Sequence, residues 1–253
     1  MVVSGLPDDG RAATVYGQIL AAIGERVDDL GPDNEIVAHW PFVGTLFGGL
    51  MIAGQALDGW DAELTSAPWR LGEMHAAKNR DRLLRGAQDW ARHLPEPIHE
   101  VVQRGNRRGK PFWDFSRRVV PILEPDSGGV WYSRYAWWNV YPLAPRRGSP
   151  TGLLKDLQRP YVAELFWAVV HELGVDRVLL VAGKDWWWEV RNLLGLHDLR
   201  PGSLPVIAAG QVRGVRVVAT YHPGAHIRGL TRDAFAAAVA SSVAGLGGTS
   251  GSA

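Results

Sequence analysis

The chain has 253 residues, of which 46% are hydrophobic and 21% are charged, and its formal net charge at pH 7 is +1. That length suits one large domain, and the composition is that of a folded globular protein rather than a disordered one. The chain contains no cysteine, which excludes disulfide bridges, thiolate metal sites, iron–sulfur clusters and a cysteine nucleophile. A net charge so close to zero produces no overall field that would attract a polyanion.

The N-terminal sequence carries acidic residues where a secretory signal peptide carries basic ones. No run of about 18 apolar residues, the length needed to cross a membrane, occurs in the sequence. The absence of cysteine also fits an intracellular protein. We therefore expect a soluble, cytoplasmic monomer without a membrane partner.

Hydrophobic periodicity predicts helices that alternate with short apolar strands. Apolar residues four positions apart indicate an amphipathic helix over residues 11–29, and an apolar run between glycines indicates a buried strand over residues 50–53. A second helix is predicted over residues 79–94, with Asn79 as its N-terminal cap, and a third over residues 111–123.

The second half of the chain continues this alternation. The predicted elements are a strand over residues 131–140, a helix over 158–173, a strand over 178–181, a helix capped by Asp185 that runs through residue 194, a hairpin of 206–212 and 215–220, and a helix from Thr231. Residues 246–253 are expected to form a flexible tail, so that residues 1–245 make one domain. The pattern predicts an α/β three-layer sandwich with a short, mostly parallel, four-stranded sheet.

Ligands of such sheets bind beyond the carboxyl ends of the strands, so the sequences that follow the predicted strands are candidate sites. Four of them stand out, in chain order: Gly54-Gln55-Ala56, Trp138-Asn139, Gly183-Lys184 and His222-Pro223. Each alone is ordinary turn or cap chemistry. Their order along the chain is the informative feature.

This order resembles the motifs of the uracil-DNA glycosylase superfamily over roughly residues 48–245. Members of that superfamily carry Gly-Gln-Asp-Pro-Tyr-His after the first sheet strand and an Asn at the end of the second. A Trp-Gly-Lys or Trp-Gly-Asn sequence ends the third strand, and a His-Pro-Ser loop follows the fourth. The resemblance implies a glycosylase-like fold without a cofactor. It also implies a monofunctional enzyme that flips a base out of double- or single-stranded DNA and hydrolyses its N-glycosidic bond.

The resemblance also implies roles for individual residues. His222 would donate a hydrogen bond to the carbonyl oxygen of the leaving base, and Asn139 would hydrogen-bond the edge of that base. The loop over residues 221–225 would press on the duplex. A wedge inserted into the DNA would come from the residues after this loop, namely His226, Ile227 or Arg228.

Two departures from the superfamily pattern concern the first motif. Ala56 stands where the superfamily has the acid that activates water, so Asp58 or Asp61 would have to take over that role. Asp58 also stands where uracil-specific members have a tyrosine that excludes substituents at C5 of the pyrimidine. A short polar side chain there would admit a bulky 5-modified cytosine, such as the glucosylated hydroxymethylcytosine of phage DNA, and would suit a role in phage defence.

Three alternatives remain open at this point. The protein would be a repair glycosylase that excises uracil if the tyrosine is not needed for that specificity. It would be a catalytically silent DNA-binding or damage-sensing module if the loss of the acid at Ala56 abolished hydrolysis. A hydrolase of free nucleosides or sugars would use the same cleft without needing a duplex.

Twelve tryptophans are unusual for a chain of this length, and several occur in runs. Most are expected to fill the core, whereas Trp60, Trp138 and Trp186 lie next to the motifs and are predicted to line the pocket. Consecutive residues of a helix point about 100° apart, so at least one indole of residues 186–188 should lie near the surface. Trp137 and Trp138 should point to opposite faces of a strand.

Basic residues near the motifs are candidates for contacts with DNA phosphates. They are Arg107, Arg108, Arg146 and Arg147, together with His226 and Arg228. His222 and His226 have the spacing of a metal pair on a helix, but Pro223 and Gly224 between them argue against a helix and therefore against a zinc site. Neither a P-loop nor a dinucleotide-binding glycine motif occurs.

Overall fold

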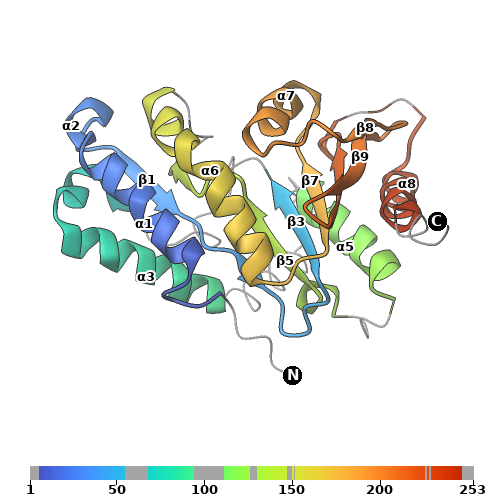
Figure 1. Ribbon diagram of the computed structural model, residues 1–253, viewed down its shortest axis with the longest axis horizontal. Coiled ribbons are helices and arrows are strands. Elements are labelled where there is room, and N and C mark those ends of the chain that lie inside the picture. The colour runs from blue at the N-terminus through green and yellow to red at the C-terminus, as the bar shows by residue number, and fades with distance from the viewer. Residues whose placement is uncertain are drawn as a thin grey trace.

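A computed structural model describes most of the chain and shows an α/β protein (Figure 1). The described residues are 6–54, 68–93, 111–125, 130–146, 150, 152–225, 227 and 229–246. Among them, no helix is both long enough and apolar enough to span a membrane.

A seven-stranded mixed sheet forms the centre of the molecule, in the order β2-β5-β3-β7-β10-β9-β8. Its strands are β2 (Phe42–Val43), β3 (Leu50–Gly54), β5 (Tyr135–Asn139), β7 (Arg177–Val181), β8 (Arg200–Pro201), β9 (Val206–Val212) and β10 (Val215–Thr220). The neighbours β5, β3, β7 and β10 are mutually parallel, whereas β2, β9 and β8 each join by antiparallel pairing. The predicted sheet of four strands is therefore too small: three antiparallel strands extend it. Of these, β9 coincides with the predicted hairpin strand 206–212, and β2 and β8 are too short to give a periodic signal.

A second, three-stranded sheet was missed by the sequence prediction. It has the order β4-β1-β6 and consists of β1 (Glu35–Ala38), β4 (Trp69–Arg70) and β6 (Leu143–Pro145), all paired antiparallel. Its outer strands are only two and three residues long. Strands of that length depend on partners that are distant in sequence rather than on a local pattern.

Helices cover both faces of the central sheet. The helices of the described residues are α1 (Arg11–Gly24), α2 (Val27–Leu30), α3 (Ala77–His93), α5 (Pro111–Leu123), α6 (Gly152–Glu172), α7 (Lys184–Leu193) and α8 (Arg232–Gly245), with short 3-10 helices η2 (Leu71–His75) and η3 (Trp131–Ser133). In Figure 1, α1 and α6 lie side by side in front of the sheet. Helices α5 and α8 pack against each other and share a core cluster with the opposite face.

Side chains that alternate along the strands separate the core into two layers. Trp138 packs in the cluster that contains α1 and α6, whereas Trp137 packs in the cluster that contains α5 and α8. The prediction that these two indoles point to opposite faces is confirmed, as the two-residue period of a strand requires. Helices on both faces of the sheet agree with the predicted sandwich of three layers.

Several predicted elements have different ends in the structure. The helix predicted over residues 11–29 is interrupted after Gly24, so its last part forms α2. The strand predicted over residues 131–140 is divided into η3 and β5. The helix predicted from residue 158 begins at Gly152 and continues through Pro160. Its early turns escaped prediction because a proline normally ends a helix.

Predicted caps were partly wrong. Asp185 lies in the first turn of α7, and Gly183 occupies the N-cap position. Asn79 lies inside α3, where its side-chain amide donates to the carbonyl of Glu73 at 2.8 Å. At α8, by contrast, the Thr231 hydroxyl accepts a hydrogen bond from the Ala234 N–H at 3.2 Å, so the predicted start is confirmed.

Candidate active site at the carboxyl edge of the sheet

The ends of the four parallel strands lie at one edge of the central sheet. In the parallel pairing, Gly54 of β3 stands beside Asn139 of β5 and beside Val181 of β7, and Thr220 of β10 also stands beside Val181. The four parallel strands therefore end level with one another. The peptide segments that follow them, including Gly183 and His222, leave the sheet from the same edge.

Asn139 presents a buried amide at this edge. Its side chain is on the face of β5 that holds Trp137, and the residue is only 1% exposed. The Nδ2 atom has no hydrogen-bond partner among the described residues. A buried amide donor without a partner costs about 1–3 kcal/mol, and a ligand that accepts from Nδ2 would recover that free energy. Gln88 Nε2 is another such donor among the described residues, so it is the place of Asn139 at the strand ends that makes its amide a candidate.

Gly54 and Phe112 form the surroundings of this amide. A Cβ atom placed on Gly54 would lie 2.9 Å from Asn139 Oδ1 and 3.7 Å from an edge carbon of Phe112. Because Gly54 has no side chain, the Asn139 amide fits against it without a steric clash. The ring of Phe112, in the first turn of α5, stands next to the same point.

The His222 loop is fixed by two glycines. Gly183 has φ +71°, a left-handed conformation that favours glycine, and a Cβ there would lie 3.6 Å from the Cβ of His222. The N–H of Gly224 donates to His222 Nδ1 at 3.1 Å. An imidazole nitrogen that accepts a hydrogen bond is unprotonated, so the neutral ring carries its proton on Nε2. The residue is exposed, on the loop that follows β10.

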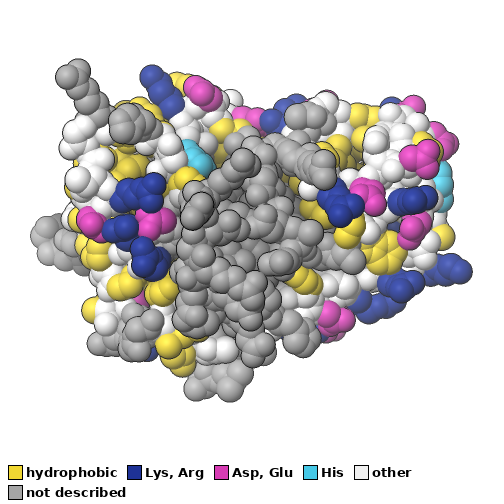
Figure 2. All heavy atoms as spheres, turned by 180° about the vertical axis from the view of Figure 1, so that it is seen from behind, with side chains coloured by type: hydrophobic (Ala, Val, Ile, Leu, Met, Phe, Trp, Pro, Cys, Tyr) yellow, Lys and Arg dark blue, Asp and Glu magenta, His cyan; other side chains and the backbone are white. Residues whose placement is uncertain are grey.

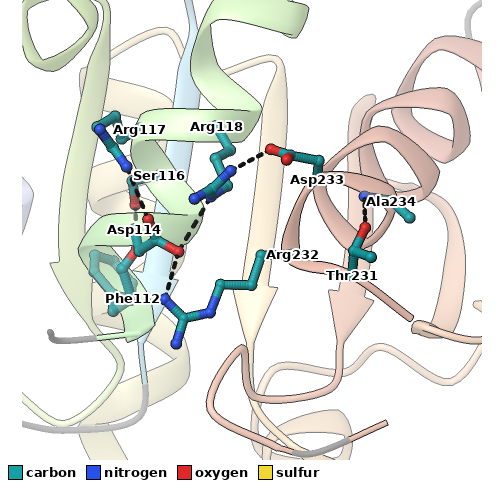
Figure 3. A network of polar contacts seen from close by, with 9 residues as sticks. All are labelled: Phe112, Asp114, Ser116, Arg117, Arg118, Thr231, Arg232, Asp233 and Ala234. Atoms are coloured by element: carbon teal, nitrogen blue, oxygen red, sulfur yellow. Dashed lines mark hydrogen bonds and ion pairs between the residues drawn. The ribbon is translucent and has the colours of Figure 1, made fainter. Parts of the chain in front are cut away.

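A carboxylate network lies on the α5 and α8 side of this loop (Figure 3). Asp114 accepts from Arg117, Arg118 and Arg232, each at 3.1 Å, and Arg118 also pairs with Asp233. Burial opposes ionisation of Asp114, but the hydrogen bonds from the three arginines outweigh it and lower its pKa. A small cavity of about 200 Å³ separates this network from the loop, and Asp114, Gly224 and Ala225 are among its lining residues.

A second carboxylate network lies on the α6 and α7 side. Glu189 accepts from the Tyr141 hydroxyl at 2.6 Å and from Arg159 at 3.2 Å, and it also pairs with Lys155. Burial raises the pKa of Glu189, but the bonds from Lys155, Tyr141 and Arg159 outweigh burial and lower it. Tyr141 follows β5 closely, so this network anchors the chain just beyond Asn139.

Two tryptophans predicted to line the pocket belong to the core instead. Trp138 is fully buried and stacks on Phe166 of α6, with ring centroids 5.9 Å apart. Trp186 is 6% exposed and lies beside Tyr141. Both side chains face the α6 layer, on the side of the sheet away from Asn139. Trp188 is 60% exposed, which confirms that one indole of the run reaches the surface.

Of the basic residues predicted to contact DNA, only Arg146 belongs to the described part of the chain. Arg146 forms an ion pair with Glu35 at 2.8 Å and lines a cavity beside the three-stranded sheet, so it is not brought to the edge that holds Asn139. Lys184 is exposed at the start of α7, next to that edge. Figure 2 shows basic and acidic side chains interspersed among the described residues of the face opposite to that of Figure 1.

Many predicted site residues lie outside the described part of the chain. They are Gln55, Ala56, Asp58, Trp60, Asp61, Arg107, Arg108, Arg147, His226 and Arg228. Within the described part, no group of three or more His, Asp or Glu side chains is arranged to hold a metal ion.

Sequence reasoning missed Phe112 and the Glu189 network. Phe112 is 27 positions before Asn139 in the chain, and only the packing of α5 against the sheet places the two at Gly54. An aromatic residue directly after a helix-starting proline was the available signal. Glu189 carried no signal, because it is one acid within an ordinary helical sequence.

No model of a known protein family matches this chain, and no curated protein is similar to it in sequence. The chemistry of the site therefore has to be inferred from its geometry.

Proposed function

We propose that this protein is a monofunctional DNA glycosylase that binds a flipped base at the carboxyl edge of its central sheet. The observation that carries the proposal is the pair of Asn139 and His222. Asn139 offers a buried amide donor without a partner, and His222 offers an Nε2 donor on a loop from the same edge. A base inside a duplex cannot reach such groups, so it would have to be extruded first.

The two donors suit the bond that would be broken. Hydrolysis forms a bond between water oxygen and the sugar C1′ carbon and breaks the bond from C1′ to the base nitrogen. The base departs with the bonding electrons, and negative charge develops on its carbonyl oxygen. His222 Nε2 would donate to that oxygen, a contribution of about 3–4 kcal/mol in comparable sites. Asn139 would hold the edge of the base, with the ring of Phe112 beside it.

Neither carboxylate of the flanking networks suits the activation of water. Asp114 and Glu189 are each occupied by three donors, and the pKa of each is lowered, so both are weak bases. In our proposal the general base that activates water is Asp58 or Asp61, which follow β3 in the sequence. A reaction with strong oxocarbenium character at the sugar would tolerate loose positioning of that aspartate.

We further propose a bulky 5-modified cytosine as substrate, with glucosylated hydroxymethylcytosine of phage DNA as the leading candidate and defence against phage as the role. This part of the proposal depends on Asp58 in place of the tyrosine that excludes 5-substituents in uracil-specific enzymes. A repair enzyme that excises uracil is the alternative, because Asn139 and His222 alone would serve either base.

Synthetic duplexes with one uracil, one hydroxymethylcytosine or one glucosylated hydroxymethylcytosine test the proposal. Incubation with the protein followed by heating in alkali cleaves the strand wherever a base has been released. We expect cleavage at glucosylated hydroxymethylcytosine and a fall of about 100–1000-fold in the His222→Ala variant. Cleavage at uracil alone would refute the modified-base substrate but not the glycosylase.

A matched control is His197→Ala, because His197 is also exposed but lies after α7, away from the edge. This variant should release bases at the wild-type rate. Wild-type protein that binds these duplexes and releases no base would be a silent DNA-binding module. Release of bases from free nucleosides at the same rate would instead indicate a nucleoside hydrolase.

A further inference from the structure

A cavity of about 360 Å³ lies beside the candidate active site, between α7 and the strands β8 and β9. Lys184 and Tyr221 are among the residues that line it, and they are the direct neighbours of Gly183 and His222 in the chain. The N–H of Tyr221 donates to the Pro205 carbonyl at 3.0 Å, which fastens the His222 loop to the wall of this cavity. The cavity therefore adjoins the segments that carry Gly183 and His222, on the α7 side of the sheet.

Two large apolar side chains stand exposed in this cavity. Trp188 is 60% exposed and Leu204 is 61% exposed, and both line it. The Arg191 guanidinium covers the Trp188 ring at 5.4 Å from its centroid. Leaving such groups in water forgoes the gain from burying them, so their position at the mouth of a cavity indicates a ligand.

The charge of the lining limits the chemistry of that ligand. Lys184 and Arg191 are cationic, and none of the described residues that line the cavity is acidic. A sugar needs acceptors as well as donors for its hydroxyl groups, and among the described residues that line the cavity the only side-chain acceptor is the hydroxyl of Tyr221. An indole face with cations beside it suits a ligand that combines a planar ring with an anion, which is the chemistry of a nucleotide.

We infer that this cavity binds a nucleotide next to the target nucleotide, on the same DNA strand, with its base on Trp188 and its phosphate near Lys184 and Arg191. The inference rests on the proposed function for the identity of the strand. Binding of this kind would hold the strand in an unstacked form while the target base occupies the site at Asn139. Stacking on an aromatic side chain is tolerant of sequence, so any of the four bases would be accepted.

Binding of labelled oligonucleotides tests the inference without requiring base release. Fluorescence anisotropy would give the Kd for single strands and for duplexes with a modified cytosine. We expect Trp188→Ala to raise the Kd about 5- to 150-fold, the range found for loss of one stacked base. Trp188→Phe should restore part of the affinity, and Arg191→Ala should reduce the dependence of the Kd on salt.

A second arginine–tryptophan contact, outside the cavity, provides the matched control. Arg82 covers Trp69 with 5.5 Å between guanidinium carbon and ring centroid, and Trp69 belongs to the three-stranded sheet. Arg82→Ala removes the same kind of contact away from the cavity. The Kd of this variant should stay within about twofold of wild type, as for an ordinary surface substitution.

An abasic scan identifies the nucleotide that occupies the cavity. In this scan, one nucleotide at a time is replaced by a tetrahydrofuran residue, which has no base. The wild-type protein should bind weakly to the oligonucleotide in which the replaced nucleotide is the one whose base stacks on Trp188. The Trp188→Ala variant should no longer distinguish that position, because two changes at one contact are not additive. Such a result with no base released from any substrate would support this cavity while refuting the glycosylase.

Wild-type affinity in Trp188→Ala would overturn the inference, even with base release intact. An equal loss in Arg82→Ala would also overturn it, since the effect would then not be specific to the cavity. Failure of wild-type protein to bind any oligonucleotide would refute the inference together with the proposed function.

Discussion

The carboxyl edge of the central sheet and the ion-pair networks beside it differ in how their buried polar groups are satisfied. At the edge, the Nδ2 atom of Asn139 has no partner within the described part of the chain. On the flanks, Asp114 receives bonds from three arginines, and Glu189 receives bonds from Lys155, Tyr141 and Arg159. Thus the carboxylates beside the sheet have several hydrogen-bond donors each, whereas the amide nitrogen at its edge has no acceptor among the described residues.

This difference separates residues that hold the fold from residues that are available to a ligand. A carboxylate with three donors has little capacity left for another partner, and removing it leaves several donors unpaired. An unpaired amide lowers stability until a ligand occupies it, which is the usual cost of a preorganised site. We therefore expect substitutions in the two regions to have opposite effects on activity and stability.

The largest effect is expected from Asn139→Leu. An apolar side chain of similar size removes the unpaired donor, so the free energy of unfolding should be unchanged or higher by about 1 kcal/mol. Base release should fall about 100-fold, because the base would lose its hydrogen-bond partner in the transition state. Urea denaturation and the duplex cleavage assay measure the two quantities on the same samples.

Asn139→Ala is a useful companion because it removes the donor but also leaves a cavity. It should lose as much activity as Asn139→Leu and be less stable than that variant. Full activity in Asn139→Leu would contradict a role for this amide in recognition. Strong destabilisation by Asn139→Leu would indicate that the amide stabilises the fold, as the carboxylates of Asp114 and Glu189 do.

A somewhat smaller effect is expected from His39, a neutral group inside the core. Its ring is fully buried and contacts Trp137, with ring centroids 4.9 Å apart. Burial lowers the pKa of His39 to about 3, whereas a histidine in an unfolded chain titrates near 6.5. Between these values the unfolded chain binds a proton that the folded chain does not, so stability falls as the pH is lowered.

The slope of this dependence is about 1.4 kcal/mol per pH unit for one group. Between pH 6.5 and pH 4.5, wild type should lose about 2–3 kcal/mol more than a His39→Phe variant, which has no group to titrate there. Chemical denaturation at several pH values measures the difference. Parallel curves for the two proteins would show that His39 is protonated in the folded state, contrary to its burial.

The smallest effect is expected from Asp114→Asn on the flank. Loss of the charge weakens three bonds from arginines, so the free energy of unfolding should fall by about 1–3 kcal/mol at neutral pH. The pKa of Asp114 is lowered in the folded protein, so its stabilisation is present above about pH 4 and is lost as the pH falls further. Thermal denaturation at pH 7 and pH 3 should show the two proteins converging at low pH.

Asp9→Asn is the control for Asp114→Asn, because Asp9 is an exposed acid in the turn before α1. It should change stability by less than about 0.5 kcal/mol. Base release in Asp114→Asn should stay close to that of wild type. A loss as large as that of His222→Ala would place Asp114 in the reaction rather than in the support of α5 and α8.

Local patterns were sufficient to predict the elements that carry strong periodicity. The strands at residues 50–53 and 178–181, the hairpin joined at Arg213 and Gly214, and the helix at residues 111–123 all agree with the structure. Each of these has an apolar pattern or a turn residue within a few positions. The strands β1, β2, β4, β6 and β8 are only two to four residues long, too short for a periodic pattern, and they form because neighbouring strands complete their hydrogen bonds.

The sequence by itself determined that four motifs follow four strands in a fixed order, and parallel pairing then brings them to one edge because every carboxyl end faces the same way. Only the tertiary structure decided which neighbours surround them. Packing placed Phe112 beside Gly54, sent Trp138 and Trp186 into the core, and paired Arg146 with Glu35. Those outcomes depend on contacts between residues far apart in the chain, which no local pattern encodes.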